Sequence, residues 1–341
     1  MTMGYIITLD SGTTNTRAIL WNPSGERAAS ANASVGVRNT AIDGNTRKLS
    51  AGVRDVLESL LRQAEIGYEE VEAIFASGMI TSNVGLVEVP HLTAPAGAEE
   101  LAAGVQEILL LDICPKPICF IPGIKNFDGP ITPENFEQMD IMRGEETESI
   151  ALIHRYGGDT PMLLVLPGSH MKFVAVDCQG RITGCLTSIS GELLNSITTD
   201  TILADAVGHQ FVSMDSYDPQ WVHLGARTAE HCGLGRACFS GRILSLFASE
   251  DHSKIANFVL GACLASDICA VSNSTALACT LDTRVVVAGK APMQQAMAEL
   301  LREEGCFRHV LTDTLTGEIP LSAQGALQIA RLWREGQERK Q

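Results

Sequence analysis

The residues of this sequence best suited to chemistry lie in two similar stretches, one in each half of the chain. In each, an apolar segment ends in a polar, glycine-containing turn, and a basic residue leads into a second apolar segment. The first turn contributes Gly12, Thr13, Thr14, Asn15 and Arg17, and the second contributes Gly168, Ser169, His170 and Lys172. Backbone amides, hydroxyls and cations bind phosphate oxygens, and glycine lets the backbone approach closely. The repetition predicts two β-hairpin tips, one per domain, that hold a polyphosphate across a cleft.

Asp10 stands at the end of the first apolar segment, directly before the first turn. A carboxylate there can hold the hydration shell of a Mg²⁺ ion that accompanies the phosphates. The alternative is an ordinary hairpin turn, in which the threonine and asparagine side chains satisfy the backbone. The second copy of the pattern favours phosphate binding. The sequence has no P-loop motif and no G-x-S-x-G motif, which argues against P-loop enzymes and makes Ser169 a poor hydrolase nucleophile.

A third reactive group lies between the two turns in sequence. Arg143, Glu145 and Glu146 stand together at the expected start of a helix. Acidic residues in a first helical turn often only complement the helix dipole. In the functional interpretation, one carboxylate takes the proton from an attacking sugar hydroxyl during phosphoryl transfer. Arg143 would then offer its planar guanidinium to a substrate carboxylate or to the transferred phosphoryl group.

Two further segments are weaker candidates. Residues 78–85 follow an expected strand and could hydrogen-bond a sugar acid through Gly78, Met79, Ser82 and Asn83, although a turn that caps the next helix fits equally well. Gly289 follows a very apolar strand and opens toward a helix, so a base or ribose could lie against it. A plain strand–turn–helix connection is the alternative for this second segment.

Composition restricts the classes of function. The 341 residues carry a formal net charge of −15, which argues against a duplex nucleic-acid partner but leaves a nucleotide possible. The 10 cysteines include no C-x-x-C pair, so a metal site or a disulfide framework is not expected. Asp10 interrupts the first apolar run, so no signal peptide is expected, and residues 255–271 are typical of a buried helix rather than a membrane span. These features predict a cytoplasmic protein without a membrane partner.

The pattern of apolar residues predicts an α/β fold with two domains, residues 1–142 and 143–341. In the first, three antiparallel strands precede a helix over 48–63, a strand over 71–76, a helix over 98–111 and a strand over 117–121. The second repeats this order, with strands over 162–166, 172–176, 181–187 and 284–288 and helices near 192–206, 240–250, 255–271, 292–301 and 321–333. Each domain is expected to contain a mixed five-stranded sheet, and the final helix can pack back on the first domain. Residues 207–239 read as irregular.

Taken together, the motifs resemble those of the bacterial 2-oxo-3-deoxygalactonate kinases, within the actin/hexokinase/Hsp70 type of ATPase. The resemblance rests on D-x-G-T-T-N-x-R at 10–17, G-M-x-x-S-N-V-G at 78–85, M-R-G-E-E-T at 142–147 and L-P-G-[ST]-H-x-K at 166–172. It implies two ribonuclease-H-like domains. It also implies ATP- and Mg²⁺-dependent phosphorylation of the 6-hydroxyl of 2-dehydro-3-deoxy-D-galactonate.

The resemblance also implies roles for individual residues. Glu145 is the first candidate for the catalytic base and Glu146 the second, because related sugar kinases place their carboxylate in this segment. Five positions depart from the pattern expected for the family: Ser11, Thr81, Leu86, His91 and Phe173. They leave open another acceptor, such as 2-dehydro-3-deoxygluconate. A non-catalytic nucleotide or sugar sensor on the same fold is the rival class, and the oligomeric state is open.

Overall fold

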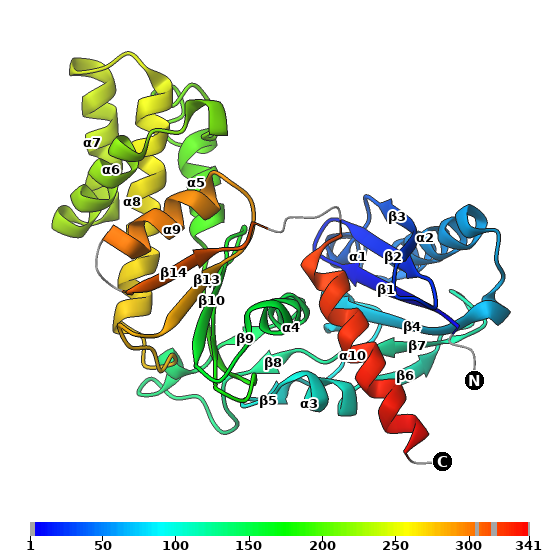
Figure 1. Ribbon diagram of the computed structural model, residues 1–341. Helices are drawn as coiled ribbons and strands as arrows, with labels where there is room; N and C mark the ends of the chain where they lie inside the picture. The colour runs from blue at the N-terminus through cyan, green and yellow to red at the C-terminus, as the bar shows by residue number, and fades with distance from the viewer. Residues whose placement is uncertain (1–3, 304–306, 315–318, 340–341) are drawn as a thin grey trace.

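The computed structural model describes residues 4–303, 307–314 and 319–339, which form a mixed α/β structure with three sheets (Figure 1). The first sheet has the strand order β3-β2-β1-β4-β7-β6, and the second has the order β12-β11-β10-β13-β14. The strands of the first sheet are β1 (Tyr5–Ser11), β2 (Thr16–Trp21), β3 (Arg27–Ala33), β4 (Val71–Gly78), β6 (Gln106–Leu109) and β7 (Pro117–Phe120). Those of the second are β10 (Met162–Leu166), β11 (Met171–Val176), β12 (Ile182–Ser188), β13 (Arg284–Val287) and β14 (His309–Thr312).

The two large sheets repeat one topology. In the first, β1 pairs antiparallel with β2 and parallel with β4, which in turn pairs parallel with β7. In the second, β10 pairs antiparallel with β11 and parallel with β13, and β13 pairs parallel with β14. The similarity of the two sequence stretches therefore corresponds to equivalent hairpins, β1–β2 and β10–β11, in equivalent sheets.

The prediction of two five-stranded sheets is wrong for the first sheet, which has a sixth strand at its edge. Residues 98–111 were expected to form one helix, but α3 (Ala98–Ala103) ends at Gly104, whose N–H donates to Glu100 O. β6 then pairs antiparallel with β7. Apolar spacing cannot anticipate this edge pairing, because the partner strand decides it. A third, small sheet contains β5 (Leu92–Thr93), β8 (Ile124–Lys125) and β9 (Ile141–Met142).

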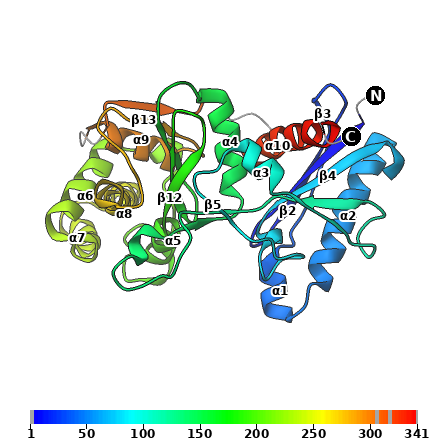
Figure 2. The same ribbon diagram turned by 90° about the horizontal axis from the view of Figure 1, so that it is seen from below.

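Helices cover both faces of the first sheet. α1 (Val37–Asp43) precedes α2 (Arg47–Ala64), which packs on β2 and β3. α4 (Glu145–Tyr156) and α10 (Leu321–Glu338) pack on each other, and α10 also contacts α3, β1 and β4. Successive residues of β1 serve the two faces: Ile7 belongs to the core under α2, and Ile6 to the core that includes Ala326 of α10. Figure 2 shows α4 lying between the two large sheets.

The second sheet carries a helical layer of α5 (Ser190–Asp200), α6 (Pro219–Cys232), α7 (Leu234–Phe247), α8 (His252–Asn273) and α9 (Met293–Glu303). The expectation that residues 207–239 are irregular is wrong, because this segment contains α6 and the start of α7. Asp218 caps α6 by accepting from Gln220 N, and Pro219 follows it. α6 buries a face of small residues: a Cβ on Gly225 would lie 1.9 Å from Phe258 O of α8.

Among the residues that the structure describes, α8 alone is long and apolar enough to cross a membrane by length and composition. Of its apolar window, 78% is buried inside the protein, as in a core helix. The division into domains at residues 142 and 143 stays a prediction. The contacts of α10 with β1 and β4 place the last described helix against the first sheet.

Candidate functional site

Each hairpin tip lies against the start of a helix. At the first tip, the α1 amides of Val37 and Arg38 donate to Gly12 O at 3.2 Å and Thr13 O at 2.9 Å. At the second, the amide of Glu192 in α5 donates to Ser169 O at 3.1 Å. Both tips are thus fixed from behind through their carbonyl groups, which leaves their outward side for a ligand.

Two glycines that sequence reasoning missed allow this close packing. A Cβ on Gly36, the residue before α1, would lie 2.5 Å from Gly12 O, and one on Gly191 in α5 would lie 2.1 Å from Gly168 O. Both distances are far shorter than a van der Waals contact, so any larger residue would displace the tip. The only signal in the sequence was the glycine itself: a helix was expected near residue 192, but none was expected near residue 37.

The polar side chains of both tips are accessible. Thr13, Thr14 and Asn15 at the first tip are exposed, and so is Ser169 at the second. The amide nitrogen of Asn15 donates to Thr14 Oγ1 at 2.9 Å, so these two side chains are already oriented by each other. The tips therefore present the groups expected of a phosphate-binding surface.

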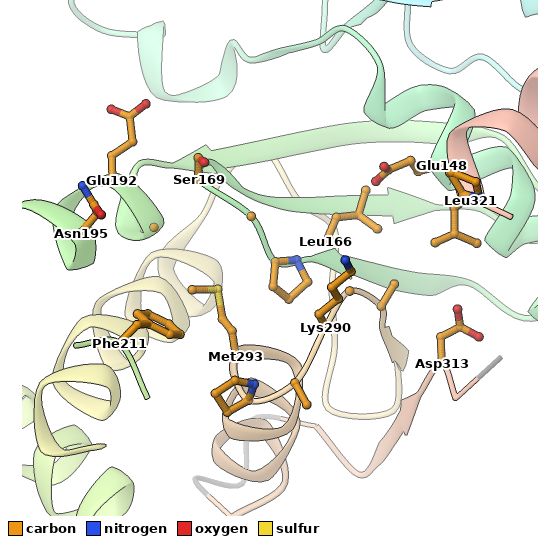
Figure 3. A pocket seen from close by; sticks show the side chains of 18 of the residues that line it. Glu148, Leu166, Ser169, Glu192, Asn195, Phe211, Lys290, Met293, Asp313 and Leu321 are labelled. Atoms are coloured by element: carbon orange, nitrogen blue, oxygen red, sulfur yellow. The ribbon is translucent and has the colours of Figure 1, made fainter. Parts of the chain in front are cut away.

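A cavity of ≈ 920 Å³ adjoins the second tip (Figure 3). Its walls come from the end of β10, the starts of α5, α9 and α10, and the first turns of α4. Its lining includes Gly168, Ser169, Gly191, Glu192, Asn195, Gly289, Lys290, Met293, Asp313 and Glu148. Ligand sites typically measure about 300–1,000 Å³, so a nucleotide-sized molecule fits. The residues of the first tip do not line this cavity.

Carboxylates gather where the cavity approaches the first sheet. Asp10 Oδ2 accepts a hydrogen bond of 3.1 Å from Ser322, the neighbour of the cavity residue Leu321. Burial raises the pKa of Asp10, and the nearby Glu145 adds to this, while Ser322 and Arg17 oppose it. Asp10 is thus a carboxylate with little compensation from neighbouring positive charge.

Gly78 and Gly144 make this convergence possible. Gly78 has φ 85°, and a Cβ there would lie 2.7 Å from Asp10 Oδ1. A Cβ on Gly144, which has φ 118°, would lie 3.3 Å from Gly78 Cα. The structure therefore brings together Asp10, residue 78 and the start of α4, which sequence reasoning assigned separately to metal, substrate and catalysis.

The three glutamates at the start of α4 differ in surroundings. Glu145 is half-buried and its Oε2 accepts from Arg143 N at 3.1 Å. Glu146 is fully buried, and burial together with Glu145 raises its pKa to about 8. Glu148, which sequence reasoning missed, lines the cavity. Its pKa is also about 8, because of burial and the neighbouring carboxylates of Asp10, Glu145 and Glu146.

The Arg143 guanidinium points to the loop after β4. It donates to Thr81 O and Thr81 Oγ1 at 2.6 Å, to Val89 O at 3.0 Å and to His91 at 3.1 Å. Burial and the adjacent Arg143 and Lys125 lower the pKa of His91 to about 4, so its ring is neutral and accepts this bond. Two of the five departures from the expected family pattern, Thr81 and His91, thus hold the arginine proposed to bind substrate.

Two other residues of the 78–85 segment, Ser82 and Asn83, were expected to bind the sugar acid. Ser82 Oγ donates to Met79 O at 2.7 Å within the turn that follows β4. Asn83 is exposed. Among the described residues, neither side chain has a hydrogen bond to Asp10, and neither lines the cavity.

Lys172 does not reach the second tip. Its side chain is buried, and Nζ donates to Ile141 O at 2.8 Å and to Thr187 Oγ1. It therefore ties β9 to β12. His170 lies at the tip with Nε2 3.0 Å from Glu192 Oε1, and Arg17 lies opposite Asp10 in the β1–β2 register.

The cavity also contains groups that the sequence did not single out. Asp313 is buried, and its carboxylate accepts hydrogen bonds from Arg155 Nη1 at 2.7 Å and from Tyr156 OH at 2.7 Å. Lys290 directly follows Gly289 and is exposed to the cavity. Their only sequence signal is position, since each lies at the end of a strand in the second sheet.

These features define a mixed α/β protein with two similar large sheets and a ligand-sized cavity between a hairpin tip and a cluster of carboxylates. Residues 10–318 match the profile of one family, and the chain belongs to that family, the 2-keto-3-deoxy-galactonokinases.

Relatives of known name agree with this assignment. The probable 2-dehydro-3-deoxygalactonokinase DgoK1 of Rhizobium meliloti (strain 1021) is 28% identical over 206 residues, which are 60% of either chain. The 2-dehydro-3-deoxygalactonokinase of Escherichia coli (strain K12) is 28% identical over 149 residues, 44% of this chain and 45% of that relative. The matches thus span less than two thirds of these relatives.

A solved structure shows the same fold over almost the whole length. It is a crystal structure from Sinorhizobium meliloti, provisionally named a 2-dehydro-3-deoxygalactonokinase protein, with a TM-score of 0.76. The superposition covers 97% of this chain and 98% of that one at 21% identity.

Proposed function

We propose that the protein is an ATP-dependent sugar-acid kinase with the actin/hexokinase type of ATPase fold. The acceptor is 2-dehydro-3-deoxy-D-galactonate, and the phosphoryl group is transferred to its 6-hydroxyl. The observation that carries the proposal is the cavity between the second hairpin tip and the Asp10–Glu148 carboxylates, in a chain of this kinase family. Equivalent tips in two equivalent sheets are what two-lobed binding of a polyphosphate requires.

Mg²⁺ fits the carboxylates beside Asp10. Carboxylate oxygens are the ligands that Mg²⁺ prefers, and the ion usually keeps several of its waters. The described residues contain no group of three or more acidic, histidine or cysteine side chains that could hold a metal directly. Asp10 would therefore hold the ion through water. When bound, the ion supplies positive charge that neutralises phosphate oxygens.

Glu145 stays the proposed base. Its half-buried carboxylate lies close enough to Asp10 to raise the pKa of that group, whereas Glu146 is buried inside the start of α4. Residues 12–15 and 168–170 would surround the phosphates, and Gly289 would face the adenosine.

The direct test is ADP release by purified protein with Mg²⁺ and ATP. The acceptors are 2-dehydro-3-deoxygalactonate, its gluconate epimer, galactonate and glycerol. Turnover with the first alone is the expected result. Turnover with the epimer alone would keep the reaction and change the acceptor, and ADP release with none of them would contradict the kinase function.

A further inference from the structure

A nucleotide's polyphosphate carries several negative charges, and the cavity offers few positive ones. Among the described residues that line it, Lys290 is the only lysine or arginine. Two of the three lining acids already have basic neighbours: Asp313 accepts a hydrogen bond of 2.7 Å from Arg155 Nη1, and Glu192 Oε1 lies 3.0 Å from His170 Nε2. The third, Glu148, lies near the carboxylates of Asp10, Glu145 and Glu146. Within the described ranges 4–303, 307–314 and 319–339, the Lys290 ammonium has no hydrogen bond or ion pair, so its charge is available to a ligand.

The cations expected from the sequence are placed elsewhere. Lys172 Nζ is buried and occupied by Ile141 O and Thr187 Oγ1. Arg17 is exposed on β2 and does not line the cavity. The second tip therefore lacks the cation, Lys172, that the sequence pattern predicted there.

The backbone places Lys290 beside that tip. Gly289 has φ 92°, and a Cβ there would lie 3.2 Å from Pro167 Cδ and 3.3 Å from Pro167 O. This contact packs the end of β13 against the residue that precedes Gly168. The side chain of Lys290 thus starts next to the second hairpin tip.

One side of the cavity is apolar, and the other side carries carboxylates. Figure 3 shows Phe211 and Met293 on one side and Glu148 and Asp313 on the other. The Lys290 side chain points toward Leu166, away from Phe211 and Met293. A flat, apolar base suits the Phe211 and Met293 wall, so the phosphates would extend past Lys290 toward Glu148.

We infer that Lys290 is the phosphate-binding cation of the nucleotide site, in the place that the sequence pattern gave to Lys172. This inference rests on the proposed kinase function, because it needs a nucleotide in the cavity. A lysine ammonium binds phosphate as a point charge. Because no other described lining residue is a lysine or arginine, removing this charge should weaken phosphate binding measurably.

Calorimetric titration of purified full-length protein with adenosine, ADP and ATP tests the inference. Lys290→Met should raise the Kd of ADP and ATP on the order of ten-fold and leave the Kd of adenosine unchanged. Lys290→Arg should restore most of the affinity. Lys48→Met, an exposed change in α2, is the matched control and should bind all three ligands like the wild type.

Four outcomes would overturn the inference. Equal affinities of Lys290→Met and wild type for ADP would remove Lys290 from the phosphates. An equal loss for adenosine and ADP would assign Lys290 to the nucleoside or to the shape of the cavity. Loss in a folded Lys172→Met variant alone would return the role to Lys172. Wild-type protein that binds neither ADP nor ATP would contradict the proposed function itself, and the inference with it.

Discussion

Glu145 and Glu146 are neighbours in sequence, yet their carboxylates meet different surroundings. Because successive residues of a helix point about 100° apart, one faces outward while the other turns into the protein. Glu145 accepts the amide of Arg143, and Glu146 accepts the amide of Gly144 at 2.7 Å. A catalytic base must be able to reach the substrate. The half-buried Glu145 meets this requirement better than the fully buried Glu146.

Glu145→Gln should lower turnover by ~10²-fold or more, the usual scale for removing a general base. The amide keeps the size of the side chain, so nucleotide affinity and the melting temperature should stay near the wild-type values. Steady-state ADP release and calorimetry with ATP measure the two effects separately. Glu134→Gln, at an exposed loop position, is the matched control. Near-normal turnover of Glu145→Gln would remove its role as base.

Glu146→Gln should change how stability depends on pH. The folded protein holds the Glu146 proton up to about pH 8, whereas the unfolded chain releases it near the ordinary pKa of 4.5. The folded state therefore binds more protons between these values, and this group makes the free energy of unfolding fall as pH rises from 4.5 to 8. Glutamine cannot titrate, so the variant should lose part of this decrease.

Urea unfolding at pH 5, 6.5 and 8 measures the difference. The stability of Glu146→Gln relative to wild type should increase steadily across this series. Glu134→Gln should run parallel to the wild type. Parallel curves for Glu146→Gln as well would mean that the buried carboxyl titrates normally.

At the level of single residues, the sequence located the carboxylates and tips but not every partner. It placed Asp10 and Glu145 in segments that the fold brings near each other. It misplaced Lys172, because a lysine after a turn looks the same whether Nζ points to the tip or to β9. Lys290 and Glu148 were missed because only the folded chain places them in the cavity.

Among the elements, the second hairpin and α5 act as one unit. Gly191 sits in the first turn of α5, with its backbone against Gly168 O and Ser169. Gly191 lines the cavity but has no side chain, so replacing it with alanine removes no ligand-binding group and mainly tests the position of the tip.

Gly191→Ala should push the second tip outward, because the new Cβ would lie 2.1 Å from Gly168 O. Overpacking of this kind costs about 1–3 kcal/mol, and we expect the Kd of ADP to rise by about ten-fold. Gly336→Ala in α10 is the matched control, since no atom lies within 4 Å of its Cβ position. Calorimetry should show normal ADP binding for the control. Normal binding by Gly191→Ala would mean that the tip position is not critical.

The sequence predicted most strands and the long amphipathic helices, where apolar periodicity is strong. α2 was expected over 48–63 and runs from Arg47 to Ala64. α6, β6 and β14 escaped detection. The buried face of α6 combines Val222 and His223 with Gly225, Ala226 and Ala229, so large apolar residues are few. The two short strands form by pairing with a neighbour.

For the whole molecule, α10 matters because it follows the second sheet in sequence but packs on the first. It packs on α4, α3, β1 and β4. A Cβ on Gly325 would lie 1.8 Å from Thr147 O, so α10 and α4 touch backbone to backbone. Trp333 of α10 meets Phe75 of β4 edge to face, with ring centroids 5.6 Å apart.

Trp333→Ala should lower the free energy of unfolding by about 2–4 kcal/mol, because it removes an aromatic partner of the buried Phe75. Trp333→Phe keeps a ring at this place and should retain most of the stability. Urea unfolding followed by circular dichroism measures both variants. If Trp333→Ala unfolds like the wild type, the docking of α10 contributes little to the first sheet.

The position of α10 also sets an order of events during protein synthesis. A ribosome completes β1 and β4 early, but it makes α10 only after all the strands of the second sheet. The face of the first sheet that α10 covers, including Phe75, therefore stays exposed to solvent until the rest of the chain has been synthesised. Exposed apolar surface of this kind is prone to aggregation. We therefore expect a chaperone to help most while the first sheet has formed and α10 has not yet been synthesised.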